Sequence, residues 1–166
     1  MRQPSPRIDA AMSDIRYREA EAGDLRAIVA MLADDMLGAG REDVSTPLAP
    51  AYLAAFEAIR ADPRQHLIVA VDGDEPIGTL QISLIPGLSN QGAWRGQIEA
   101  VRIAGGRRGE KLGERLVQWA VAYCAEHGCA SVQLTTNRKR VDAHRFYERL
   151  GFEPSHFGYK MAIPPR

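Results

Sequence analysis

The residues whose types and spacing best suit chemistry lie in a short loop, Ala104-Gly-Gly-Arg-Arg-Gly-Glu110, which Lys111 follows. Apolar residues recur at helical spacing from Lys111 to His127, so the loop leads into the N-terminus of a long helix. The first turn of a helix leaves backbone N–H groups unpaired, and the helix dipole adds partial positive charge there. Arg107, Arg108 and Lys111 add full charges. The loop therefore predicts a binding site for a phosphate or pyrophosphate group.

A solvated turn that needs glycine only for its backbone conformation would have a similar sequence, so the loop alone leaves both interpretations open. Two other phosphate-binding motifs can be tested directly. The pattern G-x-x-x-x-G-K-[ST] does not occur in the chain, and the glycines at 105, 106, 109 and 113 do not form G-x-G-x-x-G. A Walker-type loop is thus excluded, and a dinucleotide-binding fingerprint is disfavoured.

The elements around the loop must position it. A strand is predicted over 97–103, directly before the loop, and another over 131–136, directly after the helix. Because a helix joins them, a right-handed parallel crossover is expected. The other predicted elements are strands 15–18, 66–71 and 77–85, helices from Leu25, over 48–61 and over 142–150, and one or two last strands within 152–163. This order predicts an α/β fold with one mixed, mostly antiparallel sheet of six to seven strands and helices on both faces.

The composition indicates a single globular domain. Residues 1–13 are polar and contain proline, which predicts a disordered extension before a domain over 14–166. The 21 basic and 21 acidic residues cancel, so a general nucleic-acid or anionic-membrane partner is disfavoured. No apolar run could span a bilayer and no signal peptide is visible. Cys124 and Cys129 make neither a metal site nor a disulfide framework, which favours a reducing cytoplasm and no metal.

Two blocks of residues resemble the GNAT N-acetyltransferase superfamily. Arg108-Gly-Glu-Lys-Leu-Gly113 is similar to the family's phosphate motif R/Q-x-x-G-x-G/A, with Lys111 where glycine is usual. Ala143-His-Arg-Phe-Tyr-Glu-Arg-Leu-Gly-Phe152 is similar to the family's A-x-x-x-Y-x-x-x-G-F. The resemblance implies acetyl-CoA as co-substrate and acetyl transfer to a primary amine by direct attack in a ternary complex. A lysine with helical φ and ψ can still present its N–H, so we expect this geometry at Lys111 and expect phosphate binding to be kept. A positive φ there would argue against it.

The resemblance also implies how coenzyme A would lie. In the family the strand before the phosphate loop diverges from the strand after the long helix, often at a bulge, and the pantetheine arm fills the gap. The residues that this implies for cofactor binding are Val101, Arg102, Ile103, Arg107, Arg108, Gly109, Glu110, Lys111, Leu112, Gly113, Asn137, Arg140, Ala143 and Phe146.

Two residues are candidates for proton transfer. The family motif places a general acid for the departing thiolate at Tyr147, and a phenol with a pKa near ~10 is protonated at neutral pH, as this role requires. A core tyrosine with its hydroxyl at the edge is the alternative for Tyr147. Glu99 is the candidate base and is expected on the same strand face as Val101 and Ile103. A structural ion pair with Arg102 or Arg107 is the alternative for Glu99.

The acceptor is expected beside the segment between the first two helices. Asp34, Asp35 and Glu42 could form an acidic wall for an ammonium group, and Trp94 could roof the site. A solvated loop, and a tryptophan that only covers the hairpin, are the alternatives. A small-molecule amine is favoured over a protein acceptor, and its identity stays open. Two other functions remain: transfer of a longer acyl group, and a catalytically silent CoA-binding regulatory module. Homodimers are frequent in the family, but no residue fixes an interface.

Overall fold

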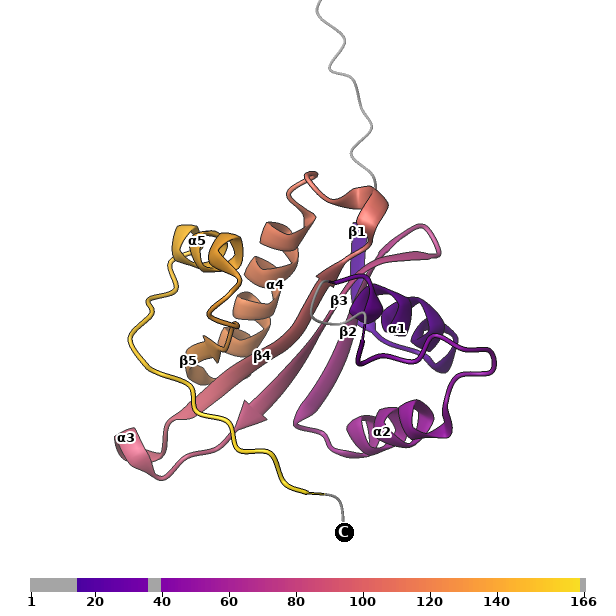
Figure 1. Ribbon diagram of the computed structural model, residues 1–166. Helices are drawn as coiled ribbons and strands as arrows, with labels where there is room; N and C mark the ends of the chain where they lie inside the picture. Colours follow the sequence, from indigo (N-terminus) through magenta and orange to yellow (C-terminus); the bar gives the residue numbers. More distant parts are fainter. Residues whose placement is uncertain (1–14, 36–39, 165–166) are drawn as a thin grey trace, which may run out of the picture.

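A five-stranded sheet in the order β1-β2-β3-β4-β5 forms the centre of the structure, a computed structural model that describes residues 15–35 and 40–164 (Figure 1). The strands are β1 (Ile15–Glu19), β2 (Gln65–Asp72), β3 (Glu75–Ile85), β4 (Trp94–Ile103) and β5 (Cys129–Leu134). Neighbours are antiparallel except β4 and β5, which are parallel as the crossover predicts. The extension predicted for residues 1–13 lies outside the described residues.

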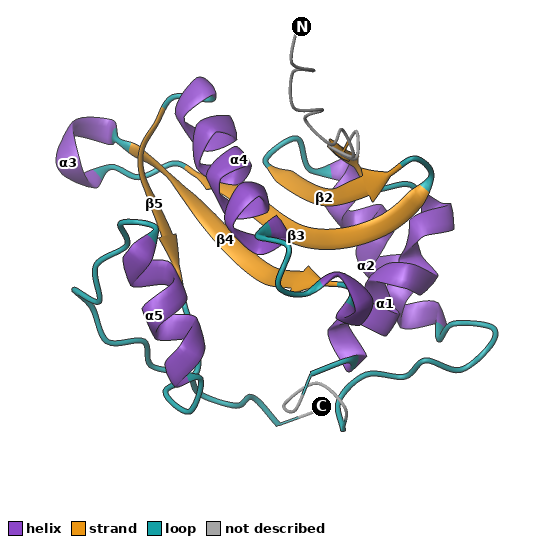
Figure 2. Cartoon of the chain, turned by 90° about the horizontal axis from the view of Figure 1, so that it is seen from above, coloured by secondary structure: helices purple, strands orange, loops and turns teal. Residues whose placement is uncertain are grey.

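The helices lie on both faces of this sheet (Figure 2). They are α1 (Leu25–Ala33), α2 (Pro50–Ala61), a single turn α3 (Ser89–Gly92), α4 (Leu112–Glu126) and α5 (Val141–Arg149). Pro50 occupies the first turn of α2, where its missing N–H leaves no hydrogen bond unmade, and the helix begins there rather than at residue 48. No helix in the part of the chain that the structure describes is long and apolar enough to cross a membrane.

Two hydrophobic clusters hold the helices to the sheet, and β2 contributes to both. Ile68 and Ala70 belong to the cluster under α4, whereas Val69 and Val71 belong to the cluster under α1 and α2. Alternate residues of a strand point to opposite faces, so a strand that is covered on both sides is apolar at every position. Phe146 and Tyr147 of α5 are half-buried and pack against the α4 cluster.

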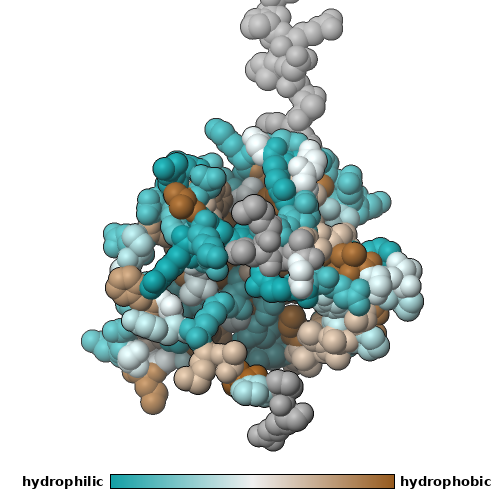
Figure 3. Space-filling model, in the orientation of Figure 1, coloured by the Kyte–Doolittle hydropathy of each residue, from teal (hydrophilic) through white to brown (hydrophobic). Residues whose placement is uncertain are grey.

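The C-terminal segment corrects the predicted strand count. Residues 152–164 contain no helix or strand, so the described sheet has five strands rather than six to seven. The segment alternates apolar residues as a strand would, but a strand also needs a neighbour to pair with. Beyond Phe152, which packs against the core, the apolar side chains stay on the surface: Phe157 is 79% exposed, and Tyr159 and Met161 are both 90% exposed. Figure 3 shows apolar residues on the surface along this segment.

Candidate active site

A bulge in β4 shapes the centre of the site. Gln81 of β3 pairs with Glu99 and Thr79 pairs with Arg102, so Leu80 alone opposes two residues of β4, Ala100 and Val101. Ala100 has a φ of 53°, in the left-handed region. Pairing between β4 and β5 ends at Ile98 and Leu134. Beyond these residues β4 diverges from β5, as predicted for this parallel pair, and leaves its backbone free for a ligand.

The bulge also changes which residues share a face. Residues directly opposite each other in an antiparallel pair point to the same side of the sheet. Thr79 and Gln81 are two residues apart on β3, so they share one face, and so do their partners on β4. Glu99 therefore shares its face with Arg102. Val101 and Ile103 instead pack against the cluster under α4. The expected common face of Glu99, Val101 and Ile103 is wrong, because the inserted residue reverses the alternation.

The phosphate loop differs from expectation at one residue. Lys111 precedes α4 with φ 58° and ψ 16°, a left-handed conformation, so the helical φ and ψ expected there are wrong. The reason lies in the turn: Arg108 is extended, Gly109 has a φ of 90°, and the chain must then reverse into the helix. Lysine here adopts a conformation that glycine adopts more easily.

The amides at the start of α4 remain available to a ligand. The amides of Arg107 and Arg108 donate to Ala104 and Gly105, and the first recorded donor of the following turn is Arg115, to Lys111. Among the described residues no carbonyl accepts from the amides of residues 109–114. Glycine and lysine in left-handed conformations within such a run turn successive N–H groups toward one side, which is the geometry of an anion-binding nest.

Carboxylates hold the two loop arginines. The Arg108 guanidinium donates to the backbone carbonyl of Asp34 at 2.7 Å and to its Oδ2 at 2.8 Å. Arg107 donates to Asp72 at 2.9 Å and to Glu110 at 3.0 Å. These contacts tie the phosphate loop to the end of α1 and to β2.

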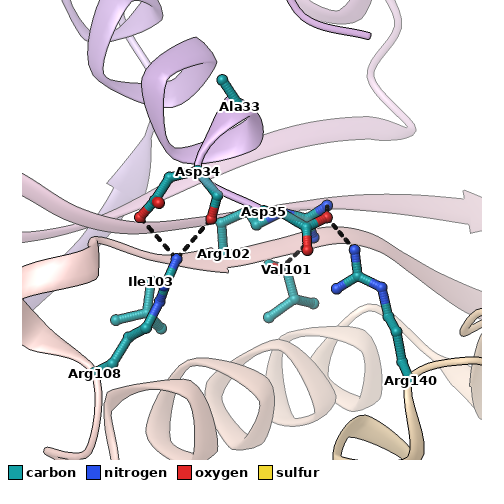
Figure 4. Close-up of a pocket in the computed structure, with 8 residues that line it drawn as sticks. All are labelled: Ala33, Asp34, Asp35, Val101, Arg102, Ile103, Arg108 and Arg140. Atoms are coloured by element: carbon teal, nitrogen blue, oxygen red, sulfur yellow. Dashed lines mark hydrogen bonds and ion pairs between the residues drawn. The ribbon is translucent and has the colours of Figure 1, made fainter. Parts of the chain in front are cut away.

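A cavity of about 590 Å³ lies where the end of α1, the bulged part of β4, the phosphate loop and the loop after β5 meet (Figure 4). It is lined by Ala33, Asp34, Asp35, Val101, Arg102, Ile103, Arg108 and Arg140. Arg102 donates to Asp35 Oδ2 at 3.3 Å, and Arg140 forms an ion pair with the same oxygen. Asp35 thus bridges two guanidinium groups from different elements.

Tyr147 stands beside this cavity on α5. Its ring packs edge-on against Phe146 at 5.1 Å and Phe152 at 5.9 Å between centroids. Burial raises the pKa of the phenol, while the charges of Arg102 and Arg140 act in the opposite direction. Tyr147 is therefore protonated at neutral pH and close to both arginines.

Other residues of the predicted cofactor site gather around the start of α4. A Cβ on Gly113 would lie 3.5 Å from Phe146 and 3.7 Å from Ile103, so α4, α5 and β4 are in close contact there. Leu112 is buried and Ala143 is half-buried. The Asn137 side chain accepts a hydrogen bond from the amide of Lys139 at 2.9 Å and thereby shapes the loop after β5.

The structure does not bring every predicted acceptor residue to the cavity. Asp34 and Asp35 line it, but both are paired with arginines rather than forming a free acidic wall. Glu42 accepts a hydrogen bond from the Tyr52 hydroxyl at 2.8 Å. Trp94 begins β4, opposite Cys129, at the far end of the strand from Val101. The pairing of Asp35 with Arg102 and Arg140 joins residues 67 and 105 positions apart, so no local pattern could indicate it.

Comparisons with known proteins agree with this architecture. The family model described as Acetyltransferase (GNAT) family matches residues 26–152. An aminoalkylphosphonate N-acetyltransferase of Salmonella typhimurium is 34% identical over 113 residues, which are 68% of this chain and 73% of the relative.

Two solved structures have the same fold. The crystal structure of a transcriptional regulator from Bacillus halodurans C-125 is 48% identical with a TM-score of 0.87, covering 90% of this chain and 99% of that one. A glucosamine-6-phosphate N-acetyltransferase from Arabidopsis thaliana shares the fold at 19% identity, with a TM-score of 0.74 and the same coverage of 90% and 99%.

Proposed function

This chain belongs to the acetyltransferase (GNAT) family, and on that premise we propose that it transfers an acetyl group from acetyl-CoA to the primary amine of a small molecule. The observation that carries the proposal is the row of amides at residues 109–114, which follows the bulged end of β4 in the chain and has no carbonyl partner in the part of the chain that the structure describes. A pyrophosphate and an extended thioester arm need those two features side by side.

In this proposal the pyrophosphate of coenzyme A binds the amides at the start of α4. Arg107, Arg108 and Lys111 surround it with positive charge. The left-handed conformation of Lys111 does not remove this cradle, because a nest is built from alternating backbone handedness. The pantetheine arm would run along the backbone of Val101 to Ile103, where β4 has left β5.

The chemistry proposed is direct attack. The amine nitrogen forms a bond to the thioester carbonyl carbon, the C–S bond breaks, and Tyr147 gives its proton to the departing thiolate. Burial raises the pKa of Tyr147, which keeps that proton available. Glu99 would take a proton from the amine, directly or through water, from the face of β4 that it shares with Arg102.

A covalent acyl-enzyme is not part of this proposal. Cys124 is fully buried on the inner side of α4, and burial raises the pKa of its thiol to about 11. Burial also raises the pKa of Cys129, while its contact with Cys124 acts in the opposite direction. A nucleophilic cysteine needs a lowered pKa and access to the substrate. Since both thiols are free, we also propose a reducing setting such as the cytoplasm.

Calorimetry with CoA, together with a free-thiol readout of CoA release across a panel of amines, tests the proposal. We expect heat on CoA binding, lost or weakened more than tenfold by Arg108→Gln, and thiol release with at least one small amine. Arg115→Gln is a matched control, because Arg115 is exposed on α4 one turn beyond the cradle. Absence of heat at millimolar CoA would remove the basis of the proposal.

A second candidate function is a CoA-binding regulatory module without turnover. The observation that favours it is the description of the 48% identical Bacillus halodurans structure as a transcriptional regulator. CoA binding without thiol release from acetyl-CoA on any amine would support this function. Thiol release only with a longer acyl-CoA would instead indicate a different acyl donor.

We further propose that the chain forms a homodimer through its C-terminal segment. Tyr159, Met161 and Ile163 alternate along it and are 90%, 90% and 89% exposed. β5 pairs only with β4 among the described strands, so one edge of the sheet is free. If the C-terminal segment of a second copy paired with this edge, it would cover the free edge of β5 and the exposed apolar side chains of the segment. Analytical ultracentrifugation should show a dimer, and Met161→Glu with Ile163→Glu should shift it to monomer; a monomeric parent chain would contradict this.

A further inference from the structure

We infer that the amine acceptor also carries an anionic group, such as a phosphonate, a phosphate or a carboxylate, and that Arg102 and Arg140 bind this group. The inference rests on the proposed acetyl transfer and narrows its substrate class. It assigns these two arginines to the acceptor, whereas the family resemblance implies that they contact the cofactor.

The charge of the cavity is the first observation. Among the described residues that line it, two carboxylates face three guanidinium groups. Asp34 is paired with Arg108, so Asp35 alone remains for Arg102 and Arg140. The inner part of the cavity therefore has one positive charge in excess, which attracts an anion and repels an amine that carries only positive charge.

Unused hydrogen-bond donors are the second observation. The Arg102 side chain is 20% exposed; its Nη1 donates to the Val101 carbonyl at 2.8 Å and its Nη2 to Asp35 at 3.3 Å. Its Nε is buried and has no partner among the described residues. Within residues 15–35 and 40–164, the Arg140 guanidinium donates only through Nη2, to the same Asp35 oxygen. A guanidinium has five N–H donors, so this pair can donate hydrogen bonds to several more oxygens.

The environment of Arg102 agrees with this interpretation. Burial lowers the pKa of its guanidinium, and the charge of Arg140 lowers it further, against the opposing effect of Asp35. The guanidinium nevertheless stays charged at any physiological pH. Two partly exposed like charges that share a single carboxylate oxygen are stabilised by a second anion. Planar guanidinium groups bind carboxylates and phosphonates through two hydrogen bonds.

The position of the pair fits the reaction. Arg102 follows the bulge residues Ala100 and Val101 directly, so an anion held by it lies next to the part of β4 proposed to receive the acyl end of the cofactor. Once an anion takes the place between Arg102 and Arg140, the Asp35 carboxylate can pair with the ammonium of the same molecule. The acceptor this fits is a small zwitterion whose amine lies a few bonds from its anionic group.

A phosphate of coenzyme A is the alternative occupant. Among the described residues, no carbonyl accepts from the amides of residues 109–114, so they already offer an anion site that follows Arg108, which lines the cavity. Arg102 and Arg140 are held by Asp35 instead. If a cofactor phosphate were the ligand of Arg102 and Arg140, replacing these arginines would weaken the binding of acetyl-CoA and not that of the acceptor.

Steady-state kinetics with matched amines tests the inference. The probes are 2-aminoethylphosphonate and β-alanine, with ethanolamine as the neutral analogue and 1,3-diaminopropane as the cationic one. We expect kcat/KM for the better anionic amine to exceed that for either control by about 10- to 100-fold, the range of a charged hydrogen-bonded pair. The ratio between the two anionic amines shows which anion the site prefers. Equal or better turnover of the neutral or cationic amine would overturn the inference while leaving acetyl transfer intact.

Two variants separate acceptor from cofactor. Arg140→Gln should raise the KM for the anionic amine at least tenfold and leave the heat of CoA binding unchanged, and Arg140→Lys should recover part of the loss. Lys139→Gln is the control with the same charge change, because Lys139 is exposed and does not line the cavity. A rise in the KM for acetyl-CoA alone would overturn the inference.

If no amine in the panel is acetylated, calorimetry on the CoA-loaded protein tests whether Arg102 and Arg140 bind an anionic amine. Binding of 2-aminoethylphosphonate or β-alanine that Arg140→Gln abolishes would support the anion site even where acetyl transfer fails. No binding of either would overturn it. Absence of CoA binding would count against the proposed function itself.

Discussion

Replacing Lys111 by glycine and, separately, by alanine tests the backbone of the phosphate loop. Lys111 has φ 58° and ψ 16°, and a non-glycine residue in this region costs about 1–2 kcal/mol. Glycine removes that strain but gives the unfolded chain more freedom, which offsets about 0.4–1 kcal/mol. Alanine keeps the strain. The glycine variant should therefore be more stable than the alanine variant by about 1 kcal/mol, or about 2–4 °C in Tm for a chain of this size.

Both variants lose the same ammonium group, so the difference between them reports the backbone alone. Urea unfolding monitored by circular dichroism measures their stability, and calorimetry with CoA at low ionic strength measures the effect of the lost charge. An exposed charge contributes about 0.2–1 kcal/mol, so CoA should bind both variants up to about fivefold more weakly than the parent chain. A glycine variant no more stable than the alanine variant would show that residue 111 is not left-handed, and our account of the loop would fail.

Three further substitutions test the core, the chemistry and the response to acid. Gly96→Ala would place a Cβ 2.3 Å from the Sγ of Cys124, so urea unfolding should show a loss of about 1–3 kcal/mol that Cys124→Ala partly recovers; full stability would contradict the close approach. Tyr147→Phe should lower kcat by about 10²-fold in stopped-time assays with little change in the KM for acetyl-CoA, and an unchanged kcat would remove this phenol from the mechanism. Burial raises the pKa of Asp24, but hydrogen bonds from Arg18 and a backbone N–H outweigh it and lower the pKa overall. The stability that this carboxylate contributes is therefore complete above its unfolded pKa of about 3.9 and is lost as the pH falls through its lower folded pKa. Asp24→Asn should cost about 1–3 kcal/mol at pH 7 and progressively less below pH 4, and a penalty that does not depend on pH would contradict this pairing.

The elements that the sequence predicts well are those whose patterns are complete within a few residues. The helix predicted over 111–127 is Leu112–Glu126, and the strand predicted over 66–71 is Gln65–Asp72. The strand predicted over 97–103 begins three residues earlier, at Trp94, because its first residues pair with β5, which lies far along the chain. The strand ends at Ile103 as predicted, because the signal for its end is the glycine-rich loop that follows directly in the sequence.

The prediction of one or two last strands was wrong because strand pairing depends on a distant segment. Residues 157–163 have the alternation of a strand, but alternation does not supply a partner, and among the described residues none pairs with them. Hydrogen bonding between strands is a property of two segments, so one segment cannot specify it.

By itself, the sequence determined the strand, the glycine-rich loop and the amphipathic helix, because turn chemistry and helical periodicity act over neighbouring residues. The anion cradle follows from these elements, and the family resemblance follows from the loop together with the block Ala143–Phe152. Only the tertiary structure decided the bulge at Ala100, which reversed the face of Glu99, and the meeting of Asp35 with Arg102 and Arg140. Both depend on the register of β4 against β3 and on three elements folding around one cavity. These long-range contacts convert an expected acidic wall into a cavity with excess positive charge.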